Sequence, residues 1–249
     1  MPDASPAAPT VAIVIPALNE EAAIGQVVRS VVERVDSVVV ADNGSTDRTA
    51  EVARAAGAQV VSVPEPGYGR ACLAGIAANE SDIVVFMDGD ASDDPADLDA
   101  LLAPIREGRA DFVVGSRRAG EAEAGSLTLP QRFGNALACG LMRLIWGGRF
   151  TDLGPFRAIR RDALERLHMQ APTFGWTVEM QVRALKAGLP YTEVPVRYRR
   201  RIGKSKISGT VRGVVMAGTY ILGTIGVEAL RGNRVGAAHK RDTPAHRPF

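Results

Sequence analysis

Short apolar runs rich in β-branched residues alternate with helically periodic segments through the first half of the chain. The runs predicted as strands are Val11 to Ile15, Ser37 to Ala41, Gln59 to Val63, Ile83 to Met87 and Phe112 to Gly115. The segments predicted as helices are Glu20 to Arg34, Asp47 to Ala56, Arg70 to Ala78 and Ala96 to Glu107. Strands that are apolar throughout and separated by helices indicate a mostly parallel α/β sheet with helices on both faces. Ligands of such sheets bind beyond the carboxyl ends of the strands.

The pattern changes after about Gly120. A loop precedes a long helical segment, and the predicted elements that follow are a helix at 130–146, a strand at 155–159, helices at 162–167 and 177–187, a strand at 191–198 and an apolar stretch at 211–230. We therefore predict one domain over residues 10–230, with a first half of about 10–118 and a second half of about 119–230. Residues 1–9 and the basic tail 231–249 are predicted to be flexible.

Composition sets broad limits on function. With 249 residues, 46% of them hydrophobic, the chain can bury the core of one α/β domain, and its formal net charge of +2 gives no general affinity for nucleic acid. Cys72 and Cys139 lack the spacing of a zinc or redox motif and are expected to be reduced and buried. The first ten residues lack a basic start followed by an apolar run, which argues against a signal peptide or anchor and favours a cytoplasmic protein.

Two carboxylates, Asp88 and Asp90, follow the fourth predicted strand directly. Their spacing lets both face one hard cation, and oxygen ligands suit Mg²⁺ or Mn²⁺ bound together with a diphosphate. Acidic residues are also common in solvated turns after strands, so this pair alone leaves both interpretations open. Histidine chemistry is not expected, because the three histidines lie outside every motif.

The ends of the first two strands carry further polar side chains. The first leads into Pro16, Asn19 and Glu20, and Asn19 can cap the helix that follows. Asp42 follows the second strand and can accept hydrogen bonds from a ribose or a base, or can belong to a helix-capping turn. A glycine series that includes Gly69 resembles a phosphate-binding loop but matches no nucleotide fingerprint.

In their order and spacing, six segments resemble the family 2 glycosyltransferases of GT-A fold, and more narrowly the group that makes dolichyl- and polyprenyl-phosphate sugars. The segments are Ile15-Pro16-Ala17-Leu18-Asn19-Glu20, Asp42-Asn43-Gly44-Ser45-Thr46-Asp47, Met87-Asp88-Gly89-Asp90, Gly115-Ser116-Arg117, Thr151-Asp152-Leu153-Gly154-Pro155-Phe156-Arg157 and Gly203-Lys204-Ser205-Lys206. The resemblance covers roughly residues 10–225. It implies a Rossmann-like GT-A fold, with a nucleotide half before about residue 118 and an acceptor half after it.

The resemblance also implies roles for single residues. It assigns the nucleoside to Pro16, Glu20 and Asp42. Asp88 and Asp90 would reach the diphosphate, with Asp90 bound to Mg²⁺ or Mn²⁺. Polyprenyl-phosphate members often have Gln two positions after the second aspartate as a further metal ligand, where this chain has Ser92. Metal affinity or metal choice is therefore expected to differ.

A basic run without any acid precedes the apolar stretch: Arg197, Arg199, Arg200, Arg201, Lys204 and Lys206. It can be a solvated loop or a loop that closes over phosphates; a nucleic-acid patch is disfavoured because no aromatic platform accompanies it. Separate motifs supply three further guanidinium groups suited to bidentate phosphate contacts, on Arg117, Arg132 and Arg157. The site could therefore hold two phosphate groups.

That possibility bears on the acceptor. A phosphate monoester has a second pKa of about 6 and needs only positioning at pH 7, whereas a sugar hydroxyl needs a carboxylate base. Abundant arginine and lysine favour the phosphate. Glu179, near the start of a predicted helix, could instead serve as a base, or it could stabilise the helix N-terminus. Trp176 could stack on a sugar or pack in the core.

The segment Gly213 to Val227 is apolar for about 15 residues, short of the roughly 20 that span a membrane. A core helix and an interfacial helix beside the site both fit this pattern. The basic tail after it could touch anionic lipid.

These observations favour an inverting, metal-dependent transferase that moves a hexose from a GDP-mannose or UDP-glucose type donor to a polyprenyl or dolichyl monophosphate, peripherally at the cytoplasmic face of the membrane. Asp152 would organise the acceptor loop. A second hypothesis keeps the donor but uses a soluble hydroxyl acceptor, with Glu179 or Asp152 as base. A third is a non-catalytic protein that binds a nucleotide sugar or a lipid phosphate.

Overall fold

The computed structural model describes residues 8–203 and 211–232, with side chains described from residue 215 onward in the second range. The sheet has seven strands in the order β3-β2-β1-β4-β6-β5-β7. Its strands are β1 (Val11–Ala17), β2 (Ser37–Asp42), β3 (Gln59–Ser62), β4 (Ile83–Phe86), β5 (Phe112–Ser116), β6 (Arg157–Arg160) and β7 (Tyr191–Pro195). Neighbouring strands pair in parallel except at β6, which is antiparallel to both β4 and β5. The predicted α/β class with a mostly parallel sheet is confirmed.

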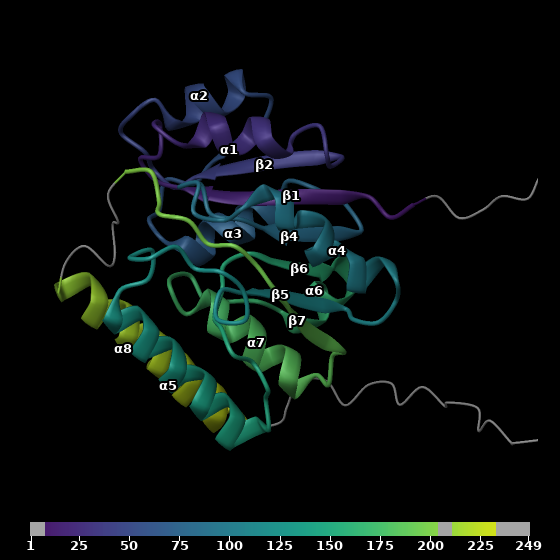
Figure 1. Cartoon of the computed structure of the whole chain (residues 1–249), viewed down its shortest axis with the longest axis vertical. Coiled ribbons are helices and arrows are strands. Elements are labelled where there is room, and N and C mark those ends of the chain that lie inside the picture. The colour runs from purple at the N-terminus through teal and green to yellow at the C-terminus, as the bar shows by residue number, and fades with distance from the viewer. Residues whose placement is uncertain (1–7, 204–210, 233–249) are drawn as a thin grey trace, which may run out of the picture.

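Helices cover both faces of this sheet (Figure 1). They are α1 (Ile24–Val31), α2 (Thr49–Ala55), α3 (Tyr68–Ala77), the short 3₁₀ turn η1 (Pro95–Asp97), α4 (Leu98–Arg106), α5 (Leu129–Trp146), α6 (Arg161–Leu167), α7 (Trp176–Lys186) and α8 (Val211–Leu230). Apolar side chains of α1, α2 and α4 form one core with the sheet, and those of α3, α5, α6, α7 and α8 contribute to the other.

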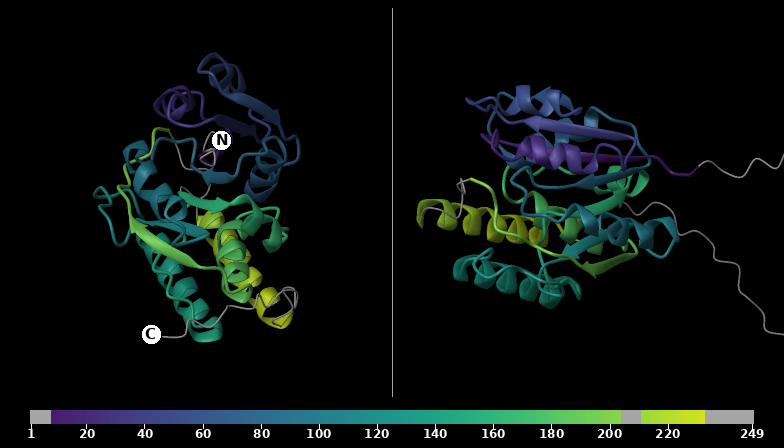
Figure 2. Two further views of the ribbon diagram at one scale, coloured as in Figure 1. Left: turned by 90° about the vertical axis from the view of Figure 1, so that its right-hand side faces the viewer. Right: turned by 45° about the horizontal axis from the view of Figure 1, so that its top comes forward.

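Helices α5 and α8 lie side by side, outside the layer that touches the sheet (Figures 1 and 2). A capping box formed by Thr128 and Gln131 starts α5, and the left-handed Gly147 ends it. α8 also packs against α7, where buried Glu228 pairs with Arg183 and Lys186. Within the described residues, no helix combines the length and apolar character needed to cross a membrane.

The first helix begins later than expected. It starts at Ile24, and its N-cap residue, Ala23, makes no side-chain capping bond. Asn19 adopts a left-handed conformation with φ 53°, and its Oδ1 accepts a hydrogen bond from the Thr46 backbone N–H at 2.8 Å. The expectation that Asn19 caps this helix is therefore wrong. Asn19 instead ties the loop after β1 to the loop after β2.

The strand order places the candidate chemistry at one edge. β1 lies between β2 and β4, so the connections leave it in opposite directions, and the crevice at such a switch point is where open α/β sheets bind ligands. Ala17 is in register with Asp42 on β2, and Val14 is in register with Phe86 on β4. The loops that follow these three strands therefore meet.

Candidate active site

A cavity of about 310 Å³ opens at the carboxyl ends of β1 and β4. Four predicted donor residues line it: Pro16, Glu20, Asp88 and Asp90. Residues that the motifs had not singled out as ligands complete the lining, among them Asn43, Tyr68 and Phe174. We call this space the donor cavity.

Two other predicted donor residues, Asp42 and Gly69, are not among the residues that line this cavity. Asp42 is 8% exposed at the end of β2, and its Oδ1 accepts a hydrogen bond from the Ser45 backbone N–H at 3.3 Å. Gly69 is buried in the first turn of α3, where a Cβ atom would lie 1.8 Å from the Ala171 carbonyl oxygen. Gly69 thus allows a close backbone approach, which differs from the phosphate-binding role considered for the glycine series.

Asn43 fastens one wall of the donor cavity. Its side-chain amide donates to the Glu65 carbonyl at 2.8 Å and accepts from the Gly67 backbone N–H at 2.7 Å. These bonds fix the loop that leads into α3 and Tyr68. The sequence signal for Asn43 was its place directly after Asp42, which equally fits a helix-capping turn.

The two carboxylates of the predicted metal site have distinct partners. Asp88 Oδ1 accepts a hydrogen bond from the Tyr68 hydroxyl at 3.2 Å, and Asp90 pairs with Arg201 at 3.0 Å. Burial, reinforced by the negative charge of Asp90, raises the pKa of Asp88 to about 7. Burial and the Asp88 charge also raise the pKa of nearby Asp93. Negative charge is concentrated here, which favours a bound cation.

These residues fit a divalent metal that takes some of its ligands from the protein and the others from a substrate. No group of three or more His, Cys, Asp or Glu side chains suited to a metal occurs within residues 8–203 and 215–232. Mg²⁺ is commonly held by one or two carboxylates together with substrate phosphates. Asp88 and Asp90 can supply such a pair. Ser92 is buried, and its Oγ has no hydrogen-bond partner within the described part of the chain.

A second cavity, of about 260 Å³, adjoins the first. Both are bordered by Tyr68, Asp88, Phe174 and Arg201, so their contents can meet there. From that junction the second cavity passes Arg117 and enters the space between α5 and α8. Its lining there is mostly small or apolar: Pro130, Gly134, Leu153, Ala217, Gly218 and Ile221. We call it the acceptor cavity.

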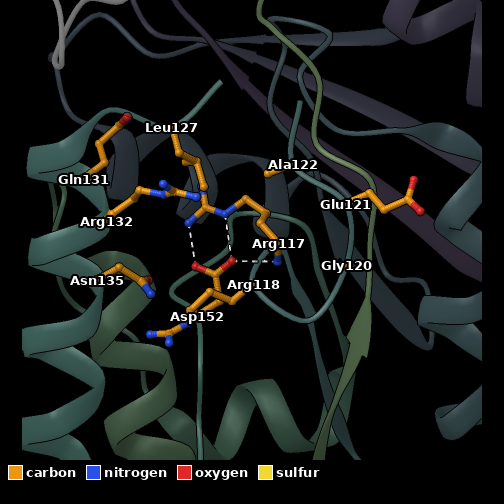
Figure 3. Close-up of a pocket in the computed structure, with 10 residues that line it drawn as sticks. All are labelled: Arg117, Arg118, Gly120, Glu121, Ala122, Leu127, Gln131, Arg132, Asn135 and Asp152. Carbon is orange, nitrogen blue, oxygen red and sulfur yellow. Dashed lines mark hydrogen bonds and ion pairs between the residues drawn. The ribbon is translucent and has the colours of Figure 1, made fainter. Parts of the chain in front are cut away.

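Arg117 is held rigidly at the wall of the acceptor cavity. Its backbone N–H and Nε both donate to Asp152 Oδ2 at 2.8 Å, and its Nη2 donates to Asp152 Oδ1 at 2.7 Å (Figure 3). The guanidinium also lies 5.0 Å from the centre of the Tyr198 ring. Burial alone would lower the pKa of Arg117, but the bonds and charge of Asp152 outweigh it and raise that pKa. Arg117 is therefore a fixed positive charge.

A larger cavity, of about 700 Å³, also borders Arg117 (Figure 3). Arg118 and Arg132 line it together with Arg117. Asn135 joins its wall and accepts a hydrogen bond from the Leu153 backbone N–H at 2.7 Å. We call this space the arginine cavity.

Arg157 does not contribute to these cavities. It is fully buried, and its guanidinium donates to the backbone carbonyls of Leu153, Gly154 and Thr177. Burial lowers its pKa to about 10. The expectation that Arg157 contacts a phosphate is therefore replaced by a structural role: it holds the loop that carries Asp152.

Glu179 and Trp176 are likewise structural. Glu179 is 3% exposed, and its carboxylate accepts hydrogen bonds from the backbone N–H groups of Gln170 and Ala171. Trp176 is 1% exposed and packs edge-on against Phe86, with ring centroids 5.9 Å apart. Of the alternatives for Trp176, the structure favours core packing. Glu179 instead anchors the backbone of residues 170 and 171, a role outside the two alternatives considered for it.

Some members of the basic run form ion pairs at the surface, and one lies at the cavities. Arg197 and Arg199 pair with Asp94, and Arg200 pairs with Glu123. Arg201 alone of the four described members lines the donor and acceptor cavities. Lys204 and Lys206 lie outside the described residues.

Comparisons with known proteins agree with this geometry. Residues 12–168 match the family model described as glycosyl transferase family 2. An uncharacterized glycosyltransferase of Mycobacterium tuberculosis is 40% identical over 210 residues, which cover 83% of this chain and 94% of the relative. A dolichyl-phosphate hexose transferase of Haloferax volcanii is 33% identical over 215 residues, 84% of this chain and 92% of the relative.

Among solved structures, glucosyl-3-phosphoglycerate synthase from Mycobacterium tuberculosis is similar over most of the chain. Its complex with Mn²⁺, uridine diphosphate and glucosyl-3-phosphoglycerate aligns with a TM-score of 0.74 and 27% identity, covering 90% of this chain and 81% of that one. The two named activities differ in acceptor, one being a lipid phosphate and the other a soluble phosphorylated acid.

Proposed function

This chain belongs to glycosyltransferase family 2, and we propose that it transfers a hexose from a nucleotide diphosphate sugar to a polyprenyl or dolichyl monophosphate at the cytoplasmic face of the membrane. The observation that carries the proposal is the acceptor cavity. It begins at Asp88, passes a fixed arginine and continues between two helices with apolar outer faces. This order of environments along the cavity matches a phosphate headgroup followed by a hydrocarbon chain.

The outer faces of α5 and α8 form a broad apolar surface. Its exposed members are Leu129, Phe133, Leu137, Leu144, Ile145, Val215, Met216, Tyr220, Leu222, Val227 and Leu230. Exposed apolar area on this scale is typical of a surface that contacts a partner or a membrane. Exposed arginines on the same helices or directly after them, Arg132, Arg143 and Arg231, could contact anionic lipid headgroups. These features support peripheral membrane contact beside the acceptor cavity.

The charged residues at the cavity junction suit a phosphate nucleophile. Arg117 and Arg201 would orient the acceptor phosphate, which is already ionised at neutral pH and attacks the anomeric carbon in line. Asp88 and Asp90 would hold the Mg²⁺ or Mn²⁺ ion, which would neutralise charge on the departing nucleotide. Glu179 is buried in backbone hydrogen bonds, so it is not available as a base, and a phosphate acceptor needs none.

The test is to incubate purified protein with polyprenyl phosphate in detergent, Mn²⁺ or Mg²⁺, and a panel of GDP- and UDP-sugars. Mass spectrometry of the organic extract should then detect a hexosyl-phosphate lipid from one donor. Failure to form any lipid product, with donor hydrolysis or a water-soluble product instead, would refute the lipid acceptor. Metal-dependent donor binding without any product would support the non-catalytic alternative.

A second candidate acceptor is a soluble phosphorylated acid. The arginine cavity supports it, because Arg118 and Arg132 line that space beside Arg117. The structurally similar synthase from Mycobacterium tuberculosis was crystallised with phosphoglyceric acid. Under this alternative, replacing Arg118 and Arg132 together by glutamine would abolish transfer to 3-phosphoglycerate. Under the lipid proposal, 3-phosphoglycerate is not glycosylated at all.

A further inference from the structure

Residues 170–175, which we call the strap, cross between the donor cavity and helix α8. On the donor side, the Pro172 carbonyl accepts a hydrogen bond from the Arg70 backbone N–H of α3 at 3.1 Å. The strap comes so close to Gly67 that a Cβ atom added there would lie 2.3 Å from the Pro172 carbonyl oxygen. The start of α3, which carries Tyr68 into the donor cavity, therefore rests on the strap.

The other side of the strap rests on α8. The Phe174 ring meets the Tyr220 ring edge-on, with centroids 6.3 Å apart. A Cβ atom at Gly175 would lie 2.2 Å from the Thr224 Oγ1, so strap and helix are in close contact. Phe174 itself borders both the donor and the acceptor cavity. The strap thus forms a common wall of the two cavities.

A buried carboxylate fixes the strap in place. Glu179 accepts from the Gln170 N–H at 3.0 Å and from the Ala171 N–H at 2.7 Å. Its other partner is the Arg183 guanidinium at 2.8 Å, which also pairs with Glu228 of α8 at 3.0 Å. Charge-assisted bonds to backbone N–H groups are among the stronger hydrogen bonds in proteins. Glu179 therefore joins the strap to a buried ion cluster that also holds α8.

We propose that Glu179 is a positioning residue for the donor: it clamps the strap, and the strap sets α3 and Tyr68 at the wall of the donor cavity. The inference rests on the proposed function only in taking that cavity to bind a nucleotide diphosphate. It gives Glu179 a role in donor binding, without contact with the donor and without proton transfer.

The test measures nucleotide affinity directly, by calorimetric titration with UDP and GDP in the presence of Mn²⁺ and the absence of acceptor. Glu179→Gln keeps the shape of the side chain but removes the charge that holds two backbone N–H groups. We expect its Kd for the preferred nucleotide to rise about tenfold, which is a loss of about 1.4 kcal/mol of binding free energy. The pH dependence of kcat should keep its shape, whereas loss of a base would remove its acidic limb.

Lys186→Met is the matched control. Lys186 pairs with Glu228 in the same buried cluster, at 2.8 Å, but does not touch the strap. This variant should lose thermal stability as Glu179→Gln does while keeping the nucleotide Kd. A second variant, Ala171→Gly, loosens the strap itself while leaving every side chain of the cluster in place, and should weaken nucleotide binding severalfold.

Three outcomes overturn the inference. They are a Kd for folded Glu179→Gln within twofold of the unsubstituted protein, an equal loss of affinity in Lys186→Met, and an unchanged Kd in Ala171→Gly if Glu179→Gln does not fold. In each of these cases the proposed function still stands. If the unsubstituted protein binds neither nucleotide with Mn²⁺, the proposed function fails first and the inference falls with it.

Discussion

Replacing Asp152 by asparagine should both destabilise the protein and disable the acceptor cavity. Asp152 is 2% exposed and receives three hydrogen bonds from Arg117, two of them from the guanidinium. Asparagine retains one acceptor oxygen but no charge, so a largely buried guanidinium is left without its counterion. Removing one partner of a buried ion pair costs about 3–5 kcal/mol. Because one acceptor remains, we expect the free energy of unfolding to fall by about 3 kcal/mol.

For a chain of this size, about 1 kcal/mol shifts Tm by roughly 2–4 °C, which gives a fall of roughly 6–12 °C. Thermal unfolding with a parallel urea titration measures this loss, and kcat/KM on polyprenyl phosphate measures the effect on transfer. Released from Asp152, Arg117 should no longer orient the phosphate, and kcat/KM should fall about a hundredfold or more. Asp99→Asn, which breaks the exposed pair with Arg34, is the control and should cost less than about 1 kcal/mol.

The double variant Arg117→Met/Asp152→Asn separates stability from function. Without the guanidinium there is no unpaired buried charge, so stability should recover most of the loss seen in Asp152→Asn. Activity should stay low because the positive charge at the acceptor cavity is gone. The reasoning is refuted if Asp152→Asn is as stable and active as the unsubstituted protein, or if the double variant regains activity.

Three further predictions follow from single positions. Asp90→Asn should reduce turnover at least a thousandfold with an unchanged circular dichroism spectrum, and chelation of divalent metal should reduce it reversibly. Activity that survives both treatments would contradict the metal assignment. Phe133→Glu should weaken sedimentation with anionic liposomes, whereas Ala55→Glu, on the distant helix α2, should not; equal binding by both variants would argue against the α5 and α8 surface. Gly75→Ala places a methyl carbon 2.3 Å from a valine side chain of β1 and should cost about 1–3 kcal/mol in urea unfolding. Its control, Gly140→Ala on open α5 surface, should be neutral or stabilising.

The sheet could be predicted from sequence because its strands are apolar throughout and end in polar turns. The first five strands end within two residues of their expected ends, and Asp88 and Asp90 line the cavity at the switch point. Arg201, which belongs to the basic run, lines the same cavity. The division of residues 10–230 into two halves stays a prediction. The antiparallel insertion of β6 between β4 and β5 depends on long-range pairing, which strand periodicity does not encode.

Residue type alone did not determine the role of several side chains. Arg157 belongs to a motif and is basic, yet it donates to carbonyl groups in the interior, because backbone acceptors in that loop need partners. Arg197 and Arg199 pair with Asp94, an acid about a hundred residues away in sequence, which no local pattern reveals. Tyr68 and Phe174 gave no motif signal, since their importance comes from where α3 and the strap meet.

The central claim concerns the acceptor, and a competition experiment tests it most directly. Purified protein, Mn²⁺ and the preferred radiolabelled nucleotide sugar would be incubated with equal concentrations of polyprenyl phosphate in detergent and 3-phosphoglycerate, followed by phase separation. The account predicts that the transferred label enters the organic phase as a hexosyl-phosphate lipid. Label transferred to 3-phosphoglycerate in the aqueous phase, with none in the lipid, would contradict it.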